Sequence, residues 1–216
     1  MTDQLIISKF KSFNFTQRVI LITFQSCKKD SAKIIYNVDE KPREIIAHGN
    51  EKYIKDKNAL ELFEMGLSNI EYKDYEKAKE YFLKANEIEK NNIVILNCLA
   101  LVESSMGNNQ KSIEMLYKNI SIDSSQINTY TNLGQNLMSE KKYIEANEIL
   151  LLGLKKSIDP NLHQKSGLLL NLAISFKNLR QCDEALKYAN EALAISQNNE
   201  FTNFANQIIV ESKKCK

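Results

Sequence analysis

The side chains best suited to catalysis or metal binding are four cysteines and two histidines, scattered along 216 residues. Cys27, Cys98, Cys182 and Cys215 contain no Cys-x-x-Cys pair, and their spacing fits no zinc or haem motif. Cys98 lies in an apolar run, where a buried thiol or one that lines a groove is the default. We therefore expect no metal site and no other cofactor.

The histidines give no better evidence of catalysis. Neither His48 nor His163 has a catalytic companion nearby in the sequence with which it forms a known motif. The chain also lacks a glycine-rich phosphate loop and a Gly-x-Ser-x-Gly motif. A catalytic site would have to be assembled from scattered residues, so the sequence does not predict an enzyme.

Cys27 is the cysteine with the most informative context. An apolar run, Val19–Phe24, precedes it, basic residues at positions 9, 11 and 18 precede that run, and Ser26 stands directly before the cysteine. This order resembles a bacterial lipoprotein signal, in which the cysteine is diacylglyceryl-modified before cleavage. The resemblance implies that residues 1–26 are a signal segment and that Cys27 is the lipid attachment site at a bacterial membrane.

An alternative is that Val19–Phe24 begins an ordinary buried strand or helix and that Cys27 is an unmodified thiol. The run is too short to span a bilayer, which requires about 20 apolar residues. The choice is therefore between an anchored and a soluble protein. Residues 27–57 are mostly polar and are interpreted as a tether.

The elements that would position any site follow a repeat. Small residues within apolar stretches recur every 34 residues at Gly66, Ala100 and Gly134, and again 39 residues later at Ala173. Twelve residues later, three of the four units have an alanine, and four residues further on, three of the four have a large apolar residue. The period and residue types resemble the tetratricopeptide repeat, a helix-turn-helix unit that stacks on its neighbours. The resemblance implies an all-α fold, a right-handed α-solenoid of about four units with a C-terminal capping helix.

The resemblance covers residues 58–216, and the expected units are 59–92, 93–126, 127–165 and 166–199, with the capping helix at 200–216. The small residue of each first helix should let the second helix approach closely. The five additional residues between the third and fourth units lie in the sequence around Ser157–Pro160. Because Pro160 cannot continue a helix, this insertion is expected in a loop.

In this family, the first helices line a concave groove that binds partners. The side chains expected there are apolar in the early units and rich in amides later: Phe63, Leu67, Asn97, Leu101, Asn128, Asn132, Gln135 and Asn171. Asn132 and Asn171 occupy equivalent positions, as in the asparagine ladders with which some members hydrogen-bond an extended peptide. The alternative is that asparagine is simply abundant in this chain.

Charge argues against two classes of partner. The formal net charge is +2 and no basic face interleaved with aromatics follows the repeats, so nucleic acid is not expected.

The carboxylate clamp of some chaperone-binding relatives needs lysine and arginine on the first helices. Its five places hold Phe63, Leu67, Cys98, Asn128 and Asn132 in one frame and Asn97, Leu101, Asn132, Gly167 and Asn171 in the other. Without a cation, that clamp is not expected.

The sequence thus predicts a non-enzymatic interaction module that binds a protein or an extended peptide in the groove and is tethered to a bacterial membrane through Cys27. One alternative is a soluble cytoplasmic adaptor with the same groove. Another is an assembly subunit whose partner binds the convex or terminal faces, for example at Phe201 and Phe204.

Overall fold

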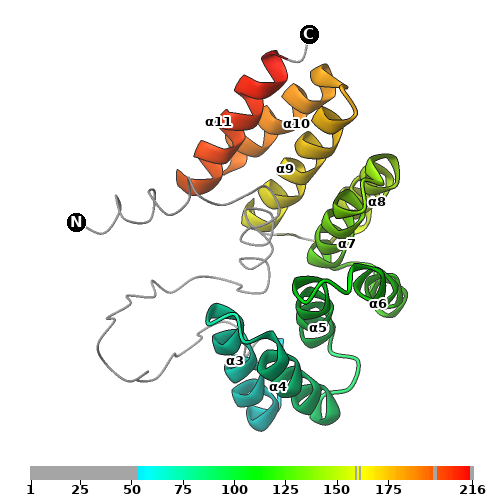
Figure 1. Cartoon of the computed structure of the whole chain (residues 1–216), viewed down its shortest axis with the longest axis vertical. Coiled ribbons are helices and arrows are strands. Elements are labelled where there is room, and N and C mark those ends of the chain that lie inside the picture. Colours follow the sequence, from blue (N-terminus) through cyan, green and yellow to red (C-terminus); the bar gives the residue numbers. More distant parts are fainter. Residues whose placement is uncertain (1–52, 159, 161, 197–198, 215–216) are drawn as a thin grey trace, which may run out of the picture. The chain divides into compact units, whose positions relative to one another are not determined.

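A computed structural model of the chain describes residues 53–158, 160, 162–196 and 199–214, with the side chains of residues 199–201 left out. The predicted signal segment, Cys27 and most of the tether lie outside these residues. The described part is helical and contains no strand (Figure 1). Its helices are α3 (Lys57–Glu71), α4 (Tyr75–Ile88), α5 (Ile93–Ser105), α6 (Asn109–Ile122), α7 (Ile127–Ser139), α8 (Tyr143–Lys156), α9 (Leu162–Asn178), α10 (Cys182–Ile195) and α11 (Asn199–Lys213).

The predicted fold class is confirmed: the protein is an all-α solenoid of helical repeats with a C-terminal helix. Consecutive helices pack in pairs, α3 with α4, α5 with α6, α7 with α8, and α9 with α10. The helices form two compact units, α3–α6 and α7–α11.

The turn inside each pair has the same backbone geometry. Two residues after the first helix ends, the chain adopts a left-handed conformation at Lys73, Gly107, Lys141 and Arg180, with φ between 59° and 88°. Only one of these residues is glycine, the residue that adopts this conformation without steric cost. Packing of the two helices therefore imposes the turn where the residue type does not favour it.

Close helix contact explains the small residues that define the period. A Cβ built on Gly66 would lie 2.5 Å from the ring of Phe82, and one on Gly134 would lie 2.6 Å from Leu150. Both large side chains belong to the second helix of the same pair. The expectation that a small residue lets the second helix approach is therefore confirmed in the first and third repeats.

The five additional residues are divided between a loop and a helix. Ser157, Ile158 and Pro160 lie between α8 and α9, as expected. However, α7 begins seven residues before Gly134, whereas α9 begins eleven residues before the equivalent Ala173. Four of the additional residues thus lengthen α9 at its N-terminus.

In the unit α3–α6, the segment before α3 is fixed to the turn between α4 and α5. The carboxylate of Glu89 accepts hydrogen bonds from the backbone N–H groups of Lys55 and of Asp56, the latter at 2.6 Å. Asn92 donates to the carbonyl of Tyr53 at 2.7 Å, and Ile54 is buried.

In the unit α7–α11, the predicted capping helix is present as α11. Ala205, Ile208 and Ile209 are buried, whereas Val210 is 52% exposed. Lys177 of α9 donates to Glu211 at 2.5 Å and links α11 to the last repeat. Phe204 is half-buried, and the side chain of Phe201 lies outside the described residues.

Candidate functional site

The predicted groove residues of the unit α3–α6 are mostly held within its core. Phe63 is fully buried, and its ring lies 5.4 Å from that of Phe82, centroid to centroid. The side chain of Asn97 accepts a hydrogen bond from Asn119 of α6 at 3.1 Å. Leu67 and Leu101 are each 6% exposed. Phe63 and Asn97 thus stabilise their own helix pairs.

The predicted amides of the unit α7–α11 lie on α7 and α9, which pack against each other. At 100° per residue, Asn132 and Asn136 stand two positions on either side of Gly134, which faces α8. They therefore lie on the face of α7 that points away from α8. Asn132 is buried, and Asn128, one turn earlier, is half-buried.

Gln135 is exceptional among the predicted amides of α7. Its side chain is 2% exposed, and neither amide atom has a hydrogen-bond partner within the described part of the chain. The equivalent position, directly after the small residue of each repeat, holds Leu67, Leu101 and Ile174. Packing alone would therefore place an aliphatic residue here. A buried polar group without a partner costs about 1–3 kcal/mol of stability.

Asn171 of α9 is incompletely satisfied in the same way. Its Nδ2 donates to the carbonyl of Gly167 one turn earlier, at 2.8 Å. Its Oδ1 is buried and accepts no hydrogen bond from any described residue. Gln135 and Asn171 together leave two acceptors and one donor group without a hydrogen bond from any described residue.

The sequence analysis omitted two polar residues at equivalent positions of these helices, Asn136 and Ser175. Asn136 is 6% exposed, and Ser175 is fully buried and donates to the carbonyl of Tyr143 at 3.0 Å. Spacing could have identified Asn136, because it lies one helical turn after Asn132. Ser175 links α9 to the start of α8 and acts in packing.

The sequence analysis also missed Glu103, a buried carboxylate at the end of α5. Its side chain forms ion pairs with Lys79 at 2.9 Å and Lys111 at 2.8 Å, and it accepts a hydrogen bond from Asn108 at 2.9 Å. Burial raises the pKa of this carboxyl, but the bonds from Lys111, Lys79 and Asn108 outweigh burial and lower the pKa to about 2. Glu103 therefore joins α4, α5 and α6 as a structural group that is ionised near neutral pH.

Two of the cysteines, Cys98 and Cys182, lie in the part of the chain that the structure describes. Cys98 is buried, which confirms one of the two environments expected for it. Cys182 is disulfide-bonded. Among the residues that the structure describes, no cluster of histidine, cysteine, aspartate and glutamate could hold a metal ion, and no helix is long and apolar enough to cross a membrane.

Comparison with known proteins supports the repeat assignment. Residues 62–92 match the family model described as tetratricopeptide repeat. This segment includes most of α3, all of α4 and the turn to α5. No curated protein matches the chain.

Several solved structures share the fold. PilF of Pseudomonas aeruginosa aligns with 21% identity and a TM-score of 0.62 over 74% of each chain. A thermophilic repeat protein of Thermus thermophilus has 14% identity and a TM-score of 0.61 over 73% of this chain and 87% of its own. MamA from Desulfovibrio magneticus RS-1 has 15% identity and a TM-score of 0.54 over 74% and 90%. At these identities the likeness establishes the fold alone, and with the family match it supports the tetratricopeptide-repeat assignment.

Proposed function

We propose that the protein is a non-enzymatic interaction module that binds an extended protein segment against the amides of α7 and α9. The fold supports this class of function, because stacked helical repeats present long surfaces for partners. Gln135 carries the proposal: both of its amide atoms are buried without a partner at a position that is aliphatic in the other repeats. An extended peptide offers an N–H group and a carbonyl at each residue, and one amide side chain can bond to both.

The chemistry of the amide set favours a neutral peptide backbone over an anion. Asn128, Asn132, Gln135 and Asn171 carry no charge. Carboxylate and phosphate groups are held most strongly by arginine and lysine. We therefore propose neither a chaperone-type carboxylate clamp nor nucleic acid as the ligand of this site.

The experiment that tests this proposal is Gln135→Leu, which installs the aliphatic residue type of the other repeats. Peptides selected from a random library against the full chain provide the ligand, and isothermal titration measures their affinity. We expect affinity to fall by about 1–3 kcal/mol because the hydrogen bonds to the peptide are lost. The free energy of unfolding should stay the same or rise, because a buried unsatisfied amide is removed.

Asn147→Ala provides a matched control. Asn147 is also a buried amide with an unsatisfied oxygen, but it lies on α8, outside the proposed binding face. Its substitution should leave peptide affinity unchanged. Equal affinities of the wild type and Gln135→Leu would refute this binding mode, and a loss in both variants would point to a general effect on folding.

We further propose that the protein is anchored to a bacterial membrane through a lipid on Cys27. The basic residues, the apolar run and the small residue before Cys27 support this anchor. In its native cell the protein should fractionate with membranes and have a mass that lacks residues 1–26 and includes the acyl groups. Cys27→Ala should release it or block its processing. Full-length, unmodified wild-type protein in the cytosol would instead establish the soluble adaptor.

The assembly-subunit alternative would place the partner on the convex or terminal faces. The same titration distinguishes it from groove binding. If the partner binds equally well to Gln135→Leu but loses affinity when Phe201 and Phe204 are both replaced by alanine, the C-terminal edge is the interaction site.

A further inference from the structure

The outer surface of α8 carries apolar side chains that its own unit leaves exposed. Ile144 is 68% exposed, Leu151 39% and Leu152 38%. Ile158, which follows the helix, is 77% exposed. Neighbouring apolar side chains that are exposed to solvent commonly mark an interaction surface.

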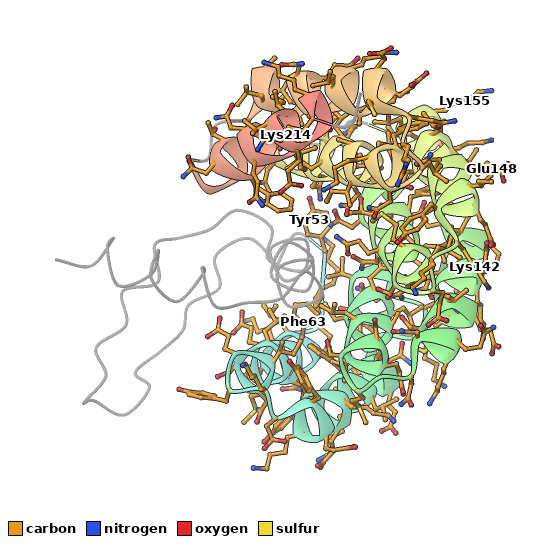
Figure 2. All side chains as sticks on the ribbon, turned by 45° about the horizontal axis from the view of Figure 1, so that its top comes forward. Tyr53, Phe63, Lys142, Glu148, Lys155 and Lys214 are labelled. Carbon is orange, nitrogen blue, oxygen red and sulfur yellow. The ribbon has the colours of Figure 1, made fainter. Side chains whose placement is uncertain are left out.

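These side chains form one ridge together with two charges. Ile144, Glu148, Leu151, Leu152 and Lys155 follow the spacing i, i+4, i+7, i+8 and i+11, which places them on one side of a helix. Figure 2 shows Glu148 and Lys155 projecting from the same side of α8. The opposite side, which includes Ala146, Leu150 and Gly153, is buried.

The charges of this ridge are available to another molecule. Neither Glu148 nor Lys155 forms an ion pair within the described residues. They stand seven residues apart, so at a rise of about 1.5 Å per residue they are separated by about 10 Å along the helix axis. Glu148 and Lys155 of the same helix are therefore too far apart to pair with each other.

The order of the ridge is self-complementary about its centre. The midpoint between Glu148 and Lys155 falls between Leu151 and Leu152. We propose that two copies of the chain associate through α8 in antiparallel orientation around this midpoint. The two-fold axis would pair Leu151 of one copy with Leu152 of the other, and Glu148 of each copy with Lys155 of its mate.

Two other occupants fit the ridge less well. Parallel pairing would place Glu148 opposite the Glu148 of the second copy, and like charges in contact repel. A lipid surface would have to accept Glu148 in the middle of the apolar ridge, where a charge is costly. Of these three arrangements, only antiparallel self-association satisfies both charges while covering the leucines.

The association should be weak. A stable protein interface buries about 800 Å² on each partner, and a ridge of five side chains on one helix offers less than that. The dimer should therefore form reversibly as the concentration rises through the micromolar range. This inference is independent of the proposed peptide site, which involves α7 and α9.

Charge reversal tests the pairing. Sedimentation velocity of the purified full chain, from low micromolar to several hundred micromolar, gives the dimer dissociation constant. Glu148→Lys and Lys155→Glu each place like charges opposite one another at both ends of the interface, so each should weaken the dimer by about tenfold or more. The double variant Glu148→Lys with Lys155→Glu restores opposite charges and should return the dissociation constant to within about threefold of the wild type.

Glu191→Lys is the matched control, because it changes net charge as Glu148→Lys does at an exposed position of α10. It should leave the dimer unchanged, and circular dichroism should show that all variants are folded. A wild-type chain that stays monomeric over the whole range would overturn the proposal. So would a dimer that tolerates both single reversals, or a double variant that remains as weak as the single ones.

Discussion

Replacement of the buried carboxylate Glu103 by glutamine should destabilise the unit α3–α6 in a manner that depends on pH. The substitution keeps the size of the side chain and removes its charge, so the ion pairs with Lys79 and Lys111 are lost. The pKa of Glu103 is about 2 in the folded protein, against 4.5 for an ordinary glutamate. At 1.36 kcal/mol for each pH unit, this difference corresponds to at most about 3 kcal/mol of stability near neutral pH.

The sign of the pH dependence follows from the lowered pKa. Glu103 is ionised in both the folded and the unfolded chain above about pH 4.5, so its full contribution is present there. As the pH falls from 4.5 towards 2, the unfolded chain takes up a proton before the folded one, and the contribution disappears. The stability difference between the wild type and Glu103→Gln should therefore be constant above pH 5 and should shrink steadily below it.

Urea denaturation monitored by circular dichroism, repeated between pH 7 and pH 3, measures this difference. Glu80→Gln is the control, because Glu80 pairs with Lys84 at 2.6 Å while both side chains are at least half exposed. That variant should unfold at nearly the same urea concentration as the wild type at every pH. A Glu103→Gln difference that is independent of pH, or no larger than that of Glu80→Gln, would refute the argument that Glu103 is a buried ionised link.

Two further predictions concern packing and binding. Gly134→Leu should cost about 1–3 kcal/mol or more, because even a Cβ would lie 2.6 Å from Leu150; thermal melting measures the loss, and an unchanged midpoint would mean that the helices do not approach closely at Gly134. The double substitution Asn132→Ala with Asn171→Ala should weaken peptide binding by about 1–3 kcal/mol and also lower stability, since both side chains are buried. Titration and melting of the same samples separate the two effects, and full affinity in a folded double variant would exclude these amides from the site.

The helical repeats could be predicted because their packing requirement is local and recurrent. Positions 66 and 134 require a small residue because a large side chain of the second helix faces each of them. The same constraint recurs in each repeat. The division of the five-residue insertion could not be predicted in the same way. Pro160 marks where α8 cannot continue, but it does not determine how early α9 begins after it.

The candidate site was only partly predictable. Helical spacing correctly grouped Asn132, Gln135 and Asn171 on first helices, yet the same reasoning placed Phe63 in a groove although its ring packs on Phe82. Spacing gives the direction of a side chain around its helix. It does not give the partner that the side chain meets, which depends on how the neighbouring helix approaches.

Comparing equivalent positions of the repeats helps to distinguish a polar residue that stabilises the fold from one that could bind a partner. Glu103 stands where the third repeat has Leu137, and Gln135 stands where the fourth repeat has Ile174. The fold supplies Glu103 with two lysines and an asparagine, so its polarity is used entirely within the α3–α6 unit. It supplies Gln135 with no hydrogen-bond partner among the described residues. Because an aliphatic side chain would suit that position better for folding alone, the amide of Gln135 supports the proposed binding of a peptide at this position.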